Sequence, residues 1–95
     1  MKFEAVVPRV GKSNRNYVSP FLATVRGELS GVESVVAEPG DAGGATVLFE
    51  TDDRDAGLWQ LQIVVNIAHR EGMDSWNAVC TVDGEEVGIF PRGGP

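Results

Sequence analysis

The residues best suited to binding a small anion lie in a polar and basic segment near the N-terminus, residues 8–18. Lysine and arginine supply positive charge, asparagine supplies amide donors, and tyrosine supplies a ring and a hydroxyl, which together suit a phosphate or a carboxylate. The segment carries Lys12, Asn14, Arg15 and Tyr17 within six positions. These four are the candidate ligand-binding residues. The simpler interpretation of the same segment is a solvated loop that binds nothing.

The triplet Gly11-Lys12-Ser13 is similar to the end of a nucleotide-binding P-loop. A P-loop also needs a glycine five residues before that first glycine, because its backbone amides wrap around the phosphates. Val6 occupies that position here. The sequence therefore does not predict a P-loop nucleotide site.

Two single residues can take part in catalysis. His69 can act as a general base because imidazole exchanges protons near neutral pH, and Cys80 can act as a nucleophile if a neighbouring base activates it. Each also has a structural interpretation, His69 at the C-terminal end of a helix and Cys80 as a small apolar residue in a strand. One histidine and one cysteine exclude an internal disulfide and zinc cages built from several such residues. We therefore assign no catalytic residue and expect no cofactor or metal.

Carboxylates gather at residues 50–55. A calcium loop alternates oxygen ligands and ends in a bidentate glutamate, and this segment has no such glutamate in register. Acidic side chains in the first turn of a helix are stabilised by the helix dipole without any metal. We therefore predict that these carboxylates mark the start of a helix.

The chain has 95 residues, enough for one small domain. Its apolar fraction of 42% and charged fraction of 23% are those of a soluble globular protein. There is no apolar run near the roughly 18–20 residues of a membrane span and no secretory signal, and a single cysteine suits a reducing compartment. We expect one domain over residues 1–90, a flexible tail at residues 91–95, a cytoplasmic location and no membrane contact.

The net charge of −6 is unevenly distributed. Residues 1–26 carry a net +4, whereas residues 27–95 carry three arginines against thirteen carboxylates, a net −10. An acidic body repels a phosphate backbone, so nucleic-acid binding is disfavoured.

Strand and helix patterns alternate along the chain. Apolar and β-branched runs predict strands at residues 2–7, 32–38, 45–51, 76–82 and 85–90. Turn residues at 39–44 and at Asp83-Gly84 join the last four into two hairpins. Ser19-Pro20 can start a helix that ends near Gly31. A strand over residues 21–25 is the alternative.

Residues 54–71 decide the fold class. With a period of two, Trp59, Leu61, Ile63, Val65 and Ile67 share one face of a strand. With a period of 3.6, Asp55, Gln62, Asn66 and His69 form one polar arc of a helix, and the remaining surface is broadly apolar. The end signals favour the helix, because Thr51, Asp52 or Asp53 can cap its start and Gly72 can close its end.

The resulting order is β-α-β-β-α-β with an extra C-terminal strand. This order resembles the ferredoxin-like split βαβ plan, an α+β fold with two helices on one face of an antiparallel sheet. The alternative is an all-β antiparallel sandwich or barrel. The resemblance is architectural and identifies no family. The heavy-metal-binding domains of this fold carry a Cys-x-x-Cys motif near the first helix, which this chain lacks.

The aromatic residues are predicted to lie in the core or on the sheet: Phe3, Phe21, Phe49, Trp59, Trp76 and Phe90. The apolar arc of the second helix is wider than one sheet face needs, and such surplus often marks an interface. We therefore expect a non-catalytic binding or assembly module that pairs with itself or with another protein. The alternatives are a regulatory domain that binds a small anionic metabolite and an enzyme that uses His69 in a pocket between subunits.

Overall fold

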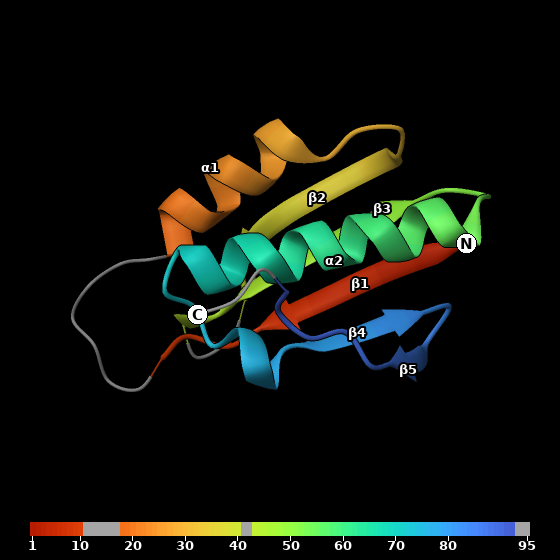
Figure 1. Cartoon of the computed structure of the whole chain (residues 1–95). Helices are drawn as coiled ribbons and strands as arrows, with labels where there is room; N and C mark the ends of the chain where they lie inside the picture. The colour runs from red at the N-terminus through yellow and green to blue at the C-terminus, as the bar shows by residue number, and fades with distance from the viewer. Residues whose placement is uncertain (11–17, 41–42, 93–95) are drawn as a thin grey trace.

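The structure is a computed structural model that describes residues 1–10, 18–40 and 43–92. Two helices cover one face of a five-stranded antiparallel sheet with the strand order β2-β3-β1-β4-β5 (Figure 1). The elements are β1 (Lys2–Val7), α1 (Val18–Glu28), β2 (Glu33–Pro39), β3 (Ala45–Glu50), α2 (Arg54–Arg70), the 3₁₀ turn η2 (Ser75–Asn77), β4 (Val79–Val82) and β5 (Glu85–Val87). This is the ferredoxin-like α+β sandwich with an extra strand, as predicted. The all-β alternative is wrong.

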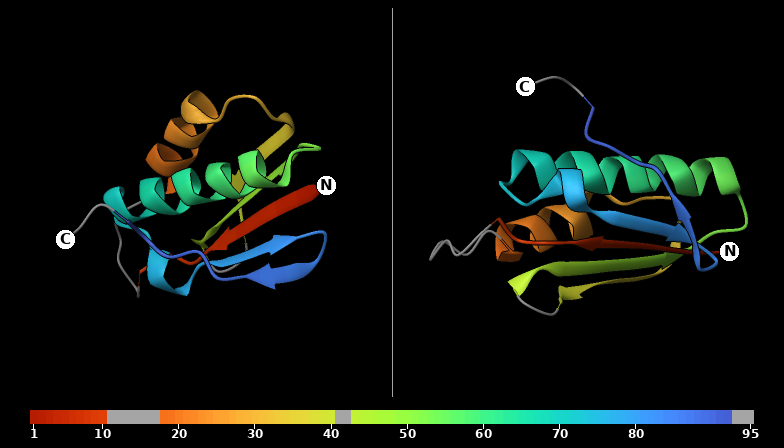
Figure 2. Two further views of the ribbon diagram at one scale, coloured as in Figure 1. Left: turned by 45° about the vertical axis from the view of Figure 1, so that its right-hand side comes forward. Right: turned by 90° about the horizontal axis from the view of Figure 1, so that it is seen from below.

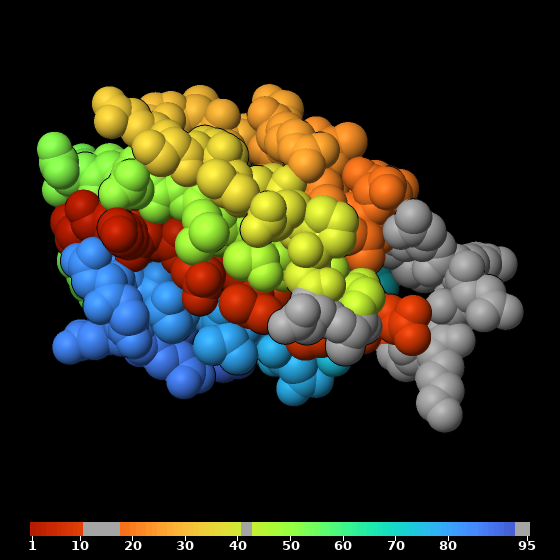
Figure 3. Space-filling view, turned by 180° about the vertical axis from the view of Figure 1, so that it is seen from behind, coloured from red at the N-terminus to blue at the C-terminus, as the bar shows by residue number. Residues whose placement is uncertain are grey.

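The central strand β1 organises the core. It pairs with β3 on one side and with β4 on the other, so Phe3 lies opposite both Phe49 and Val82. Alternate residues of β1, Phe3, Ala5 and Val7, are fully buried beneath the helices. Among the described residues, both helices lie on that one face, and Figure 3 shows β2, β3, β1 and β4 side by side across the opposite face. Figure 2 shows the two layers from the side.

Helix α2 has the predicted end signals. Asp53 is the N-cap residue and accepts a hydrogen bond of 3.1 Å from the backbone N–H of Ala56. At the other end, Gly72 has a positive φ of 83° and the N–H of Met73 donates to the carbonyl of Ala68 at 2.9 Å. These bonds form a Schellman closure, which satisfies carbonyls that the helix leaves unpaired. Within the described ranges, no helix is long and apolar enough to cross a membrane.

Helix α1 is confirmed with different ends. It begins at Val18, one residue before Ser19, so Pro20 is the third helical residue. Pro20 still lies in the first turn, where a backbone N–H has no partner within the helix. The helix ends at Glu28, and the left-handed Gly31, φ 70°, turns the chain into β2.

Both predicted hairpins are present. Pro39 pairs with Ala45 across the first, and Asp83 and Gly84 have φ values of 50° and 86° in the second, as a tight I′ turn requires. Two predicted boundaries are wrong by three residues, whereas those of β2 and β3 differ by one. Strand β4 begins at Val79 because η2 occupies the preceding residues, and β5 ends at Val87 rather than at residue 90.

Candidate binding face on helix α2 and the C-terminal strap

The predicted anion-binding residues Lys12, Asn14, Arg15 and Tyr17 lie outside the described residues. That hypothesis therefore stays a prediction. The structure forms a cleft from other residues, none of which was predicted to bind a small anion.

The aromatic residues fall into two groups. Phe3, Phe21 and Phe49 are fully buried, as predicted. The prediction is wrong for three others, because Trp59, Trp76 and Phe90 are 59%, 60% and 57% exposed. Each has a structural reason: Trp59 lies on the outward side of α2, Trp76 lies in η2 rather than in a strand, and Phe90 follows the end of β5.

Trp59 carried a sequence signal of its own. It lies four residues after Asp55 and three before Gln62, so a helical period places it within the polar arc rather than on the core side. No comparable signal was available for Trp76 or Phe90, whose surroundings depend on where η2 begins and where β5 ends.

Residues 88–92 form what we call the strap, an irregular segment that runs beside α2 toward its C-terminal end (Figure 2). The side-chain amide of Gln62 donates to the carbonyl of Phe90 at 2.7 Å and to Oδ1 of Asn66 at 2.9 Å. The backbone N–H of Arg92 donates to the same Asn66 oxygen at 2.8 Å. The polar arc of α2 is thus partly a docking track for the strap, which explains why Gln62 is buried.

The strap also bears on two earlier expectations. It is bonded to Gln62 and Asn66, so part of the polar arc of α2 is covered by the strap. Arg92 belongs to the residues expected to form a flexible tail, yet its backbone is bonded to α2. Residues 93–95 lie outside the described residues.

An open cleft of about 380 Å³ separates the start of α2 from the beginning of the strap. It is lined by Arg54, Asp55, Leu58, Trp59, Gln62, Val87, Gly88, Ile89 and Arg92. In the part of the chain that the structure describes, neither guanidinium, of Arg54 or of Arg92, has a hydrogen bond or an ion pair. The cleft therefore presents two free cations beside an apolar wall.

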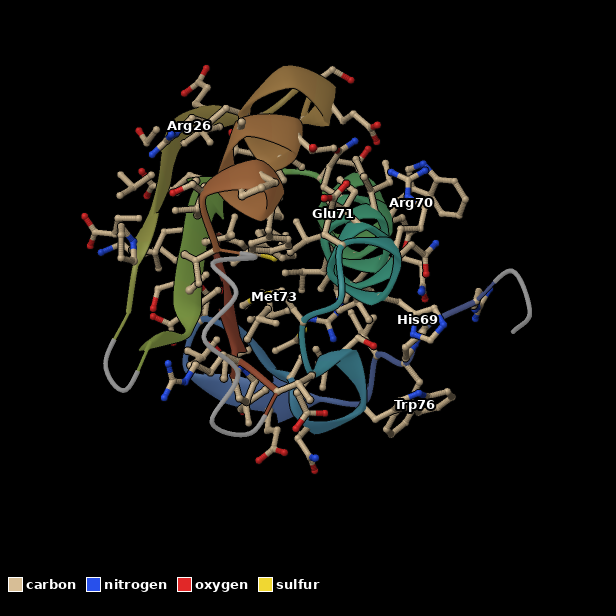
Figure 4. The ribbon with its side chains drawn as sticks, turned by 90° about the vertical axis from the view of Figure 1, so that its left-hand side faces the viewer. Arg26, His69, Arg70, Glu71, Met73 and Trp76 are labelled. Carbon is tan, nitrogen blue, oxygen red and sulfur yellow. The ribbon has the colours of Figure 1, made fainter. Side chains whose placement is uncertain are left out.

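His69 lies in the last turn of α2, as predicted, and is held by side-chain contacts. Its Nδ1 is 3.1 Å from Oγ of the buried Ser75, and its ring meets Trp76 edge-on at 6.3 Å between centroids. Trp76 in turn stacks on Phe90 at 6.3 Å. Figure 4 shows His69 and Trp76 on one side of the helix end, whereas Met73 points inward. These contacts tie the end of α2 to η2 and to the strap.

Cys80 is a buried residue of β4, as the apolar interpretation predicted. Burial raises the pKa of its thiol to about 11. We expect the folded protein to react with a disulfide reagent such as Ellman's reagent at pH 8 at least about 100-fold more slowly than the urea-unfolded chain, because labelling requires an opening of the structure. Equal rates in the folded and unfolded states would contradict this burial.

The same pKa shift makes stability depend on alkaline pH. A thiol whose pKa is higher in the folded state stabilises the fold below the ordinary thiol pKa of about 8.5. This contribution should be lost as the pH rises toward about 11. Cys80→Ala should flatten this part of the pH–stability curve.

The two sheet edges are poorly suited to pairing with another strand. Edge strand β2 has a register shift between Glu33 and Val36, a positive φ of 55° at Ser34 and a terminal proline. Edge strand β5 has three residues, of which two are glutamates. Bulges, prolines, short length and charge all oppose edge-to-edge association. An association surface is better sought on the helices.

The described residues contain no group of three or more side chains able to hold a metal ion. Asp53, one of the carboxylates considered for calcium, is the cap of α2. Comparison of the chain with models of known families, with curated proteins and with solved structures gave no match.

Proposed function

We propose that the protein is a small, non-catalytic assembly module that forms a homodimer through the outward face of α2. The observation that carries the proposal is the position of Trp59, a large apolar side chain that is 59% exposed in the middle of a charged helix face. Tryptophan and arginine are the residues that contribute most strongly to protein interfaces. An exposed tryptophan between complementary charges favours a specific contact.

The outward face of α2 is a single stripe. Asp55, Trp59, Ile63, Asn66 and Arg70 recur at intervals of three or four residues, which places them in one row along the helix. Asp55 and Arg70 are exposed, and Ile63 and Asn66 are half-buried. With 17 residues, the helix is about 25 Å long, so the stripe offers a contact of useful length.

Charge along the stripe is self-complementary. On the stripe, Asp55 lies in the first turn and Arg70 lies in the last turn, whereas Arg54, which is also in the first turn, lies off the stripe and lines the cleft. Two copies packed with antiparallel α2 helices would place Asp55 of each opposite Arg70 of the other, with Trp59 opposite Asn66. Antiparallel packing also opposes the two helix dipoles favourably. A two-fold axis near Ile63 generates both charge pairs, as an isologous dimer requires.

A charge swap tests the dimer. The wild-type chain should sediment near twice its 10.1 kDa mass at high protein concentration. Asp55→Arg or Arg70→Glu alone should place like charges together twice per dimer and weaken association by about tenfold or more. The double variant, Asp55→Arg with Arg70→Glu, restores both pairs with reversed sign and should dimerise again. Sedimentation equilibrium measures all four proteins, and circular dichroism checks that each is folded.

Two tryptophan variants serve as matched controls. Trp59→Ala should abolish the dimer because it removes the central apolar contact. Trp76→Ala removes an equally exposed tryptophan that lies off the stripe, and it should leave association unchanged. A wild-type chain that is strictly monomeric at about 1 mM, or a double charge variant that stays as weak as the single ones, would overturn the proposal.

A further inference from the structure

We propose that the cleft between α2 and the strap binds a planar aromatic anion, a ring system bearing a carboxylate or a phosphate. One copy of the chain supplies every residue that lines the cleft, so the inference does not require the dimer. Because Asp55 and Trp59 also lie on the stripe proposed for the dimer, the cleft is tested at protein concentrations at which the chain is monomeric. It also differs from the predicted anion site at residues 11–17, which shares no residue with the cleft.

The apolar side of the cleft suits a flat ring. Leu58, Val87 and Ile89 supply aliphatic surface from α2 and from the end of β5 and the strap. The indole of Trp59 lies at the margin of the same space and remains more than half exposed. Aromatic rings gain from stacking or edge contacts with an indole beyond the burial of their area. The cleft volume of about 380 Å³ is at the small end of the range for ligand sites.

The polar side of the cleft suits an anion. Arg54 and Arg92 approach it from two different elements, the first turn of α2 and the strap. Carboxylates outnumber arginines thirteen to three in residues 27–95. Even so, neither of these two guanidinium groups is paired with a carboxylate within the described ranges. Asp55 contributes one negative charge, so the lining carries a net positive charge in an acidic body. Guanidinium groups bind carboxylates and phosphates with charge-assisted, often bidentate hydrogen bonds.

Three probes with the same ring separate these contributions: 2-naphthoate, 2-naphthyl phosphate and the neutral 2-naphthol. Each is titrated into ¹⁵N-labelled protein and followed by amide and indole chemical shifts. The chain has two tryptophans, so the indole N–H of Trp59 reports on the cleft and that of Trp76 reports on the surface outside it. At least one anionic probe should shift Trp59 and residues 88–92 saturably, with little change at Trp76, and should bind more tightly than 2-naphthol.

The variants test the assigned cations. Replacing Arg54 and Arg92 together with glutamine should weaken the anionic probes by about tenfold and leave 2-naphthol unchanged. Arg70→Gln is the matched control: its guanidinium is paired with Glu28 outside the cleft, so its loss should leave probe binding unchanged even if it weakens the dimer. Binding by only one of the two anions would identify the head group.

Three results would overturn the inference. They are equal affinity for 2-naphthol and the anions, unchanged anion affinity in the double arginine variant, and shifts centred away from Trp59 and the strap. None of these results bears on dimerisation, which the sedimentation experiment decides.

Discussion

Replacing Gly57 with alanine is expected to destabilise the protein by about 3 kcal/mol or more. A Cβ atom at this position would lie 2.0 Å from Cζ of Phe3, far inside van der Waals contact. The Phe3 ring cannot easily move, because it is fully buried and stacked on Phe49 with 5.2 Å between ring centroids. The absence of a side chain at Gly57 thus allows α2 to pack closely on β1. Urea unfolding followed by circular dichroism measures the effect.

Gly27→Ala is the matched control in the other helix. Gly27 also lies inside a helix, but a Cβ there would have no neighbour within 4 Å. Alanine should therefore stabilise the protein by up to about 1 kcal/mol, the usual helix-propensity difference. The two substitutions should change the free energy of unfolding in opposite directions. Because both replace a helical glycine with alanine, the difference between them measures the packing clash rather than helix propensity. If Phe3→Leu failed to recover any stability in the Gly57→Ala background, the proposed clash would not be the cause.

The sequence predicted those parts of the fold that short-range signals determine. The Gly72 closure and the Asp83-Gly84 turn act within a few residues, and each lies where the pattern placed it. The cap of α2, Asp53, is one of the three residues that the pattern allowed. The apolar and β-branched run at residues 2–7 predicted the strand β1 for the same reason. With these ends and turns, the order of elements already indicated the split βαβ plan.

The candidate site was less predictable because it depends on contacts between distant segments. Gln62 is polar, and a helical period alone places it in solvent. Its burial results from a bond to the carbonyl of Phe90, 28 residues away. The cleft likewise needs Arg54 of α2 and Arg92 of the strap to line the same space. No local sequence pattern indicates that two such distant residues lie together. The sequence therefore predicted an anion site at residues 11–17, where the cations are close in sequence.

The helix over residues 54–70 was predicted correctly, but the exposure of Trp59 on that helix was not. Both the strand and the helix interpretations treated Trp59 as an apolar residue and predicted that it lies in the core or on the sheet. The helical period instead groups it with Asp55 and Asn66, and the structure leaves it exposed. The exposure of Trp59 is therefore the feature of this site that could have been predicted from the sequence, because a large apolar residue lies within the polar arc of the helix.

The two stacked aromatic pairs, Phe3–Phe49 and Trp76–Phe90, are expected to differ strongly in their contribution to the free energy of unfolding. Phe49→Ala should cost about 3–5 kcal/mol, because it removes a buried ring from the stack with Phe3 and leaves a cavity in the core. Phe90→Ala removes a ring that stacks on Trp76 but is 57% exposed, and it should cost less than about 1.5 kcal/mol. The carbonyl of residue 90 remains to accept from Gln62, so the strap should stay docked. Thermal and urea unfolding of both variants measure the contrast.

This contrast bears on function as well as on stability. A protein of this size has a stability of about 5–15 kcal/mol, so losing the buried pair would consume much of it. The Trp76–Phe90 pair, by contrast, is expected to add little to the fold while exposing two large rings to solvent. These two rings lie off the α2 stripe and outside the cleft lining, so any contact they make would be separate from the two surfaces proposed above. If Phe90→Ala instead lowered the free energy of unfolding as much as Phe49→Ala, the strap would be part of the core. The aromatic ring of Phe90 would then be explained by stability alone.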